Sequence, residues 1–185
     1  MYCIKSSQCC EEVIKKSRFI AIISPCHSET EVAQQLQQWH HQHPNASHIV
    51  FAYRIKTNQG IISRFNDAGE PSGTAGKPVY QHIEGKQLIN TLIVVIRYFG
   101  GIKLGAGGLT RAYSQSAKLA IAAAKINDYI EYEQLKLNLD YKQLQSFQYH
   151  LKKLEGVIIE QNFTEKIQLI IKVPVDNVEA VLNLK

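Results

Sequence analysis

The sequence predicts an α+β fold in two domains, residues 1–128 and 129–185. A near-continuous apolar run over residues 87–99 is typical of a strand in the middle of a sheet, and amphipathic helical patterns lie on either side of it. After Asn127-Asp128 the pattern restarts as strand, helix, two strands and helix. That order is the βαββα start of a ferredoxin-like unit, so we expect a small ferredoxin-like domain to follow a larger α+β domain.

Strand and helix signals divide the first domain. Pro25 ends a strand pattern, and Ser28 with Glu31 matches a capping box at the start of a helix. Residues 66–78, "NDAGEPSGTAGKP", hereafter the acidic loop, are too rich in Gly, Pro and Ser for regular structure. The regular elements expected besides 87–99 are a strand over 15–26, a helix over 28–44, two strands over 47–65 and a helix over 109–125.

The second domain is expected to lack the last strand of the ferredoxin-like unit, because residues 174–184 predict a helix as the last element. An open sheet edge would follow, and such an edge predicts a homodimer formed by pairing with a second chain. We expect each domain to have its own core. The predicted core residues are Phe19, Trp39, Phe51 and 92–96 in the first domain, and Leu137, Leu144, Leu151 and Ile170 in the second.

Composition limits the classes of function. No apolar stretch reaches the ~20 residues of a membrane span, and the N-terminus has no signal-peptide core, so we expect a cytoplasmic protein. The four cysteines are expected to be reduced thiols. Residues 1–130 contain 14 lysines and arginines against 8 acidic residues, whereas residues 131–185 contain 7 against 8. The first domain therefore has all the net positive charge, and an anionic partner is expected there.

Residues 100–108, hereafter the glycine loop, contain five glycines between the apolar run and a helix. The loop matches neither a P-loop nor a Rossmann fingerprint. Its backbone N–H groups could still form an anion site before the helix, or the glycines could serve only tight packing with Arg111 neutralised by Asp67 or Glu70. The residues predicted to bind an anion or nucleic acid are Arg97, Gly100, Gly101, Lys103, Gly105, Gly107, Gly108 and Arg111.

The acidic loop is the second candidate part of the site. Ser72 stands in "GEPSG", which lacks the G-x-S-x-G spacing of a nucleophile elbow, so no catalytic residue is predicted. Four histidines, His40, His41, His43 and His48, lack zinc-site spacing, and neither metal nor cofactor is predicted. The residues of this loop assigned to the site are Asp67, Glu70, Ser72, Thr74 and Lys77.

Four motifs in order resemble the IMPACT family, whose bacterial members are of the YigZ type. They are "KSRFIA", "SHIVFAYR", "NDAGEPSGTAGKPVY" and "VIRYFGGIKLGAGGLTRAYSQSA". The resemblance implies a first domain of the ribosomal-protein and elongation-factor type and a ferredoxin-like second domain similar to the last domain of EF-G. At the start of the acidic loop many relatives have two adjacent acidic residues, whereas this chain has Asn66 before Asp67.

The resemblance also implies a role in translation, because eukaryotic members restrain a translation-control kinase. Three hypotheses stay open at this point. The first is a non-enzymatic binding protein that docks RNA or a ribosome-associated partner through the glycine loop. The second is an enzyme for a phosphorylated or acyl small molecule, with Asp67 or Glu70 as the base. In the third, both loops are purely structural.

Overall fold

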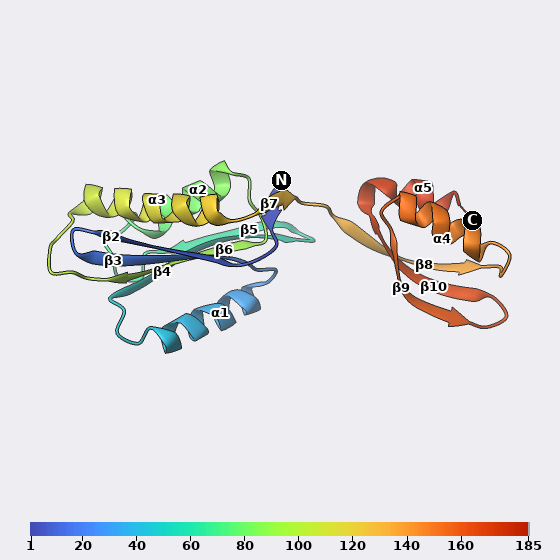
Figure 1. Ribbon diagram of the computed structural model, residues 1–185, viewed down its shortest axis with the longest axis horizontal. Helices are drawn as coiled ribbons and strands as arrows, with labels where there is room; N and C mark the ends of the chain where they lie inside the picture. The colour runs from blue at the N-terminus through green and yellow to red at the C-terminus, as the bar shows by residue number, and fades with distance from the viewer. Residues whose placement is uncertain (185) are drawn as a thin grey trace. The chain divides into compact units, whose positions relative to one another are not determined.

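The computed structural model describes residues 1–184, and its contacts divide the chain into two units, Met1–Tyr129 and Ile130–Lys185 (Figure 1). Both units combine helices with antiparallel sheets, which confirms the α+β class. Among residues 1–184, no helix has the length and apolar character needed to cross a membrane.

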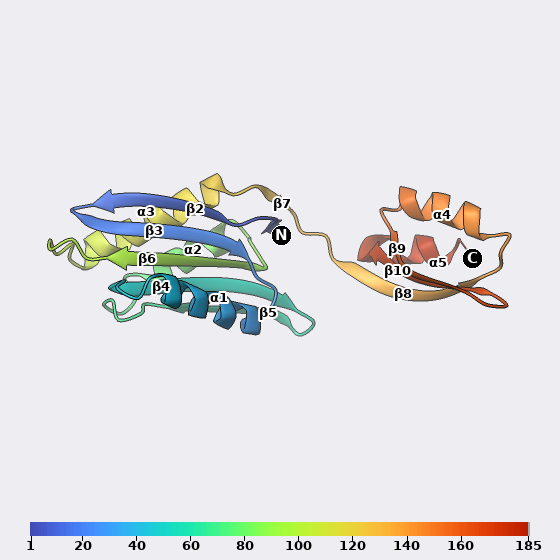
Figure 2. The ribbon, with the colours of Figure 1, turned by 60° about the horizontal axis from the view of Figure 1, so that its bottom comes forward.

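The first unit is built on a five-stranded antiparallel sheet with the order β2-β3-β6-β4-β5 (Figure 2). The apolar run forms β6, which has neighbours on both sides and is buried from Thr91 to Arg97. The prediction of a middle strand there is confirmed. The strands are β2 (Gln8–Ile14), β3 (Ser17–Pro25), β4 (His48–Thr57), β5 (Gly60–Asn66) and β6 (Thr91–Tyr98).

Helices cover both faces of this sheet. In Figure 1, α1 (Glu29–Gln42) lies on one face, and α2 (Gly76–Gly85) and α3 (Ala106–Ala123) lie on the other. A short antiparallel pair, β1 (Tyr2–Ile4) with β7 (Ile126–Asp128), joins the two ends of the unit. No signal in residues 1–14 predicted β1 or β2.

The buried side chains of the first unit form two clusters, not the single core that we expected. Successive side chains of a strand point to opposite faces, so β6 serves both clusters. Ile93 and Val95 pack with Phe19 on the α2 and α3 side. Trp39 and Phe51 pack on the α1 side, together with Leu92, Val94 and Ile96.

The start of α1 follows the predicted capping pattern in part. Ser28 Oγ accepts the Glu31 N–H at 3.1 Å, as an N-cap should. The Glu31 carboxylate, however, accepts the N–H of His27, one residue before the residue that a capping box would use. Both contacts satisfy backbone N–H groups at or just before the start of the helix.

Helix α2 was not predicted, because it starts inside the acidic loop without a capping side chain next to it. Its N-cap is Ala75, which has no side-chain hydrogen bond. Asp67 takes that role from nine residues upstream, since its Oδ1 accepts the N–H groups of Gly76 at 2.7 Å and Ala75 at 3.1 Å. The irregular part of the acidic loop therefore ends at Ala75.

The second unit has a three-stranded antiparallel sheet with the order β8-β10-β9, and its helices cover one face (Figure 1). Its core contains Leu137 and Leu151, with Leu144 packed against it. Ile170 was wrongly predicted for this core, because the alternation of β10 buries its neighbours Leu169 and Ile171 instead. The elements are β8 (Tyr132–Leu139), α4 (Leu144–Lys153), β9 (Val157–Phe163), β10 (Ile167–Pro174), a 3₁₀ turn (Val175–Asn177) and α5 (Val178–Leu182).

Strand β8 is at one edge of that sheet, and within residues 1–184 its only strand partner is β10. The order matches a ferredoxin-like unit in which the fourth strand would pair with β8. The homodimer through this edge stays a prediction.

Candidate functional site

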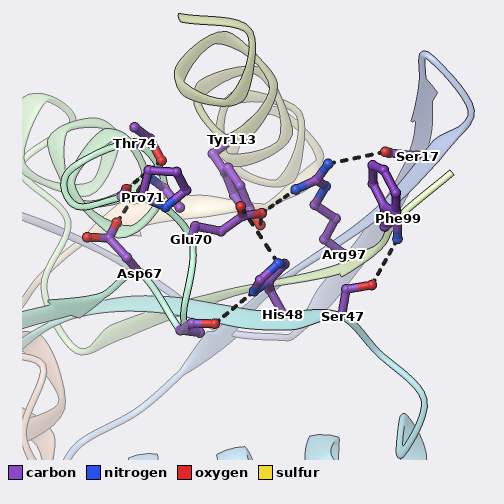
Figure 3. A network of polar contacts seen from close by, with 12 residues as sticks. Ser17, Ser47, His48, Asp67, Glu70, Pro71, Thr74, Arg97, Phe99 and Tyr113 are labelled. Atoms are coloured by element: carbon purple, nitrogen blue, oxygen red, sulfur yellow. Dashed lines mark hydrogen bonds and ion pairs between the residues drawn. The ribbon is translucent and has the colours of Figure 1, made fainter. Parts of the chain in front are cut away.

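The acidic loop and the glycine loop flank one site at the end of β6. Arg97, the second-last residue of β6, donates from Nη1 to Glu70 Oε1 of the acidic loop at 2.6 Å. This ion pair joins the acidic loop to the strand that leads into the glycine loop. Figure 3 shows that this ion pair is the centre of a larger set of polar contacts.

The ion pair is part of a polar network in which Glu70, Arg97, Tyr113 and Ser17 are buried and His48 is partly exposed (Figure 3). The Tyr113 hydroxyl donates to Glu70 Oε1 at 2.7 Å, and Arg97 Nη2 donates to Ser17 Oγ at 3.3 Å. His48 Nε2 lies 3.7 Å from Glu70 Oε2, while its Nδ1 hydrogen-bonds the carbonyl oxygen of Ala68 at 2.9 Å. Burial, and then the neighbouring Glu70 carboxylate, raise the pKa of Tyr113 above its ordinary value.

Arg97 is not the surface cation that the sequence analysis assigned to a phosphate. Its side chain is 6% exposed and that of Glu70 is 4% exposed. The guanidinium carbon lies 5.5 Å from the ring centre of Phe19 and 5.6 Å from that of Phe99. A buried charge needs a partner of opposite sign, and Glu70 supplies it. Arg97 therefore joins β6 to the acidic loop.

Asp67 holds the acidic loop in shape. Besides its two contacts at the start of α2, its Oδ2 accepts the N–H of Gly73 at 2.8 Å. Thr74 adds a bond from Oγ1 to the carbonyl oxygen of Pro71 at 2.6 Å. Ser72 and Lys77, the other predicted residues of this loop, are exposed. Because its carboxylate already accepts three N–H groups, Asp67 is not a free base.

The glycines of the glycine loop differ in what they do. A Cβ on Gly100 would lie 1.9 Å from the carbonyl oxygen of Lys16, so glycine is needed there for close packing on the β2–β3 turn. Gly101 and Gly105 have φ of 86° and 72°, and Gly105 is the N-cap of α3. A Cβ on Gly107 would meet nothing within 4 Å. The packing explanation therefore holds for Gly100 and gives no reason for Gly107.

The N-terminal end of α3 is open to an anion. Among residues 1–184, neither a capping side chain nor an acidic residue of the first turn satisfies its N–H groups. The N–H groups of Ala106, Gly107 and Gly108 precede the first helical bond, which Leu109 donates to Gly105. An 18-residue helix with such an end has the field and the donors that bind phosphate.

Exposed cations surround this helix end. Lys103 is exposed beside it, and Arg111 is exposed in the second turn, not the first, because α3 begins at Ala106. Within residues 1–184, neither Asp67 nor Glu70 pairs with Arg111. Lys15 lines a hollow together with Arg111, and the sequence analysis missed it. Lys15, Lys103 and Arg111 are hereafter the basic rim.

The histidines do not form a metal centre in the described part of the chain, where no cluster of three or more metal-ligating side chains occurs. His40 and His43 lie with His48 around a hollow of about 430 Å³ between α1 and β4. His43 Nδ1 lies 2.8 Å from the Tyr98 hydroxyl. Of the four, only His48 reaches the buried network, and nothing in the sequence pattern set it apart.

Comparisons with known proteins agree on one family. Residues 15–121 match the Impact N-terminal domain, and residues 137–184 match a domain of unknown function (DUF1949). An IMPACT family member from Haemophilus influenzae is 37% identical over 177 residues, which are 95% of this chain and 86% of that protein. IMPACT family member YigZ of Escherichia coli is 30% identical, over 88% of this chain and 80% of that protein.

A solved structure supports the fold across both units. It is described as the crystal structure of an hypothetical protein, with a TM-score of 0.72 and 28% sequence identity. The match covers 97% of this chain and 88% of the other. The two-unit architecture is therefore shared with a protein of related sequence.

Proposed function

The chain belongs to the IMPACT family, and we propose that it is a non-enzymatic binding protein of the cytoplasm, linked to translation, that docks RNA. The names of its relatives specify no ligand, so the proposal of RNA rests on the surface of this chain. The contact surface is the basic rim together with the first turn of α3. The translation link follows the expectation set by the family resemblance.

One observation carries the proposal: the basic rim surrounds a helix end whose N–H groups no side chain of residues 1–184 caps. A cation near a helix N-terminus is unfavourable unless an anion lies nearby. Lys103 lies just before this helix end. Lys15 and Arg111 line the hollow described above, which lies next to the same helix end. A chain of phosphates matches such a spread of positive charge better than a single small anion.

The carboxylates weigh against the enzyme hypothesis. Glu70 is ion-paired to Arg97 and accepts the Tyr113 hydroxyl, and Asp67 accepts three backbone N–H groups. A general base needs a free lone pair within reach of substrate. Glu70 instead joins the acidic loop to β6 and α3, and Asp67 holds the acidic loop in shape, which favours binding over catalysis.

The test is a salt titration of binding to a single-stranded RNA oligonucleotide of about twelve nucleotides, followed by fluorescence anisotropy. Each phosphate contact contributes about −0.7 to the slope of log affinity against log salt. We expect Lys103→Ala and Arg111→Ala each to weaken binding for all RNA sequences alike and to flatten the slope by about 0.7.

Lys118→Ala is the matched control, because Lys118 is an exposed lysine of the same helix two turns beyond Arg111. It should change the slope little. If the Lys103→Ala/Arg111→Ala double variant binds RNA like the parent across the titration, the RNA proposal is wrong. A protein that binds no RNA, yet keeps a partner from a nuclease-treated lysate, would instead support docking of a ribosome-associated protein.

A further inference from the structure

A small pocket lies between the acidic loop and the start of α3. Its volume is about 310 Å³, at the lower end of the range for ligand sites, so it suits a small flat group. Gly105 and Ala106, the N-cap and the first residue of α3, are part of its wall. Pro71, Phe99, Leu104 and Leu109 supply its apolar walls, and Glu70, Arg97 and Lys103 its polar ones.

Phe99 is the feature of this pocket that needs an explanation. Phe99 is the residue directly after β6, and it is 49% exposed, although phenylalanine is usually buried. Its backbone N–H donates to Ser47 Oγ at 3.0 Å, so the main chain is held in place (Figure 3). The Arg97 guanidinium lies 5.6 Å from the ring centre. The ring is therefore supported by a buried cation and still accessible.

One polar group beside the pocket also has no hydrogen-bond partner in the described part of the chain. Arg97 is 5% exposed, and its Nε–H has no hydrogen-bond acceptor among residues 1–184. A buried donor without an acceptor is costly, and because Nε is covered in this structure, a ligand acceptor could reach it only if the wall of the pocket shifted. The pocket therefore combines the aromatic face of Phe99 with the exposed cation Lys103 and the N–H groups at the start of α3.

We infer that the pocket seats one unpaired nucleobase of the RNA, stacked on Phe99, while the phosphate of the same nucleotide lies at the first turn of α3. The inference rests on the proposed RNA function and adds how a single strand is recognised. Unpaired bases commonly stack on aromatic side chains, whereas bases in a duplex are not available for this. A site of this kind selects single-stranded over double-stranded RNA.

The experiment compares two oligomers of equal length, a uridine 12-mer and its abasic analogue, which has the same phosphates and lacks the bases. We expect the parent to bind the uridine 12-mer about 5- to 150-fold more tightly than the abasic chain. Phe99→Ala should remove most of that difference and leave the salt slope unchanged, because stacking involves no counterion release. Phe99→Trp should restore it.

Phe65→Ala is the matched control, because Phe65 is 45% exposed on β5 and does not line the pocket. It should leave both affinities unchanged. If Phe99→Ala leaves the preference for bases intact while Lys103→Ala flattens the salt slope, the pocket inference is wrong and the RNA function stands. If neither oligomer binds the parent protein, both fail.

Discussion

Replacing Glu70 with Gln tests whether the buried ion pair holds the acidic loop to β6. The Glu70 and Arg97 side chains are 4% and 6% exposed, and their charged atoms are 2.6 Å apart. At an effective dielectric constant of about 20, unit charges at that distance attract by about 6 kcal/mol. The Gln amide oxygen can still accept one hydrogen bond, so part of this attraction is retained. We expect the variant to lose about 3 kcal/mol of the free energy of unfolding, the lower end for a broken buried pair.

The assay is urea unfolding followed by tryptophan fluorescence. Trp39 is the one tryptophan of the chain and lies in the first unit, so the signal reports that unit alone. The slope of free energy against urea should stay unchanged, which shows that the midpoint shift is a stability change.

Glu11→Gln is the matched control. Glu11 accepts from Arg18 at the same 2.6 Å, but the side chains of that pair are 45% and 49% exposed. Exposed ion pairs contribute little, so the control variant should unfold close to the parent midpoint. If Glu70→Gln costs no more than Glu11→Gln, burial does not strengthen the Arg97 contact, and the account of the network given above fails.

Three further predictions use the same unfolding assay. Gly107→Ala should stabilise the first unit by about 0.5 kcal/mol or more, because the new Cβ meets nothing within 4 Å and alanine favours helix. Gly100→Ala should destabilise it strongly, because its Cβ would lie 1.9 Å from a backbone oxygen; equal effects at both positions would contradict these different roles. The third position is Tyr113, whose folded pKa is raised above the ordinary 10.0, so the folded state holds this proton more tightly than the unfolded state. Stability from this group is complete below pH 10 and falls as the pH rises above it, and Tyr113→Phe should make the fall less steep. An equal fall in parent and variant would show that Tyr113 does not contribute.

The sequence determined the local elements well where the period of the apolar residues and the positions of Gly, Pro and Asn indicate the same boundaries. The apolar run of β6 and the Asn58-Gln59-Gly60 turn between β4 and β5 were predictable, because strand period and turn chemistry are local. The helix α3 was also predictable from its period, although its first turn lies inside the glycine loop. Motifs in order were enough to indicate the family.

Elements that depend on distant partners were not predictable. Helix α2 begins where Asp67, nine residues upstream, accepts the Gly76 N–H, and no local cap announces it. The two clusters on the faces of the sheet needed the positions of three helices as well as the strand alternation. For the same reason, β2 was missed, since its pairing with β3 rather than its own pattern defines it.

For the site, the sequence determined which residue types were present, and only the tertiary structure decided which of them are buried and paired. In the sequence, three cations lie in or near the glycine loop and nothing distinguishes them: Arg97, Lys103 and Arg111. In the structure, Arg97 is buried against Glu70, while the other two are exposed. Lys15 joins them only because the β2–β3 turn packs on Gly100. The physical reason is that charge type is a property of a residue, whereas burial and pairing of the charge depend on which distant segments pack around it.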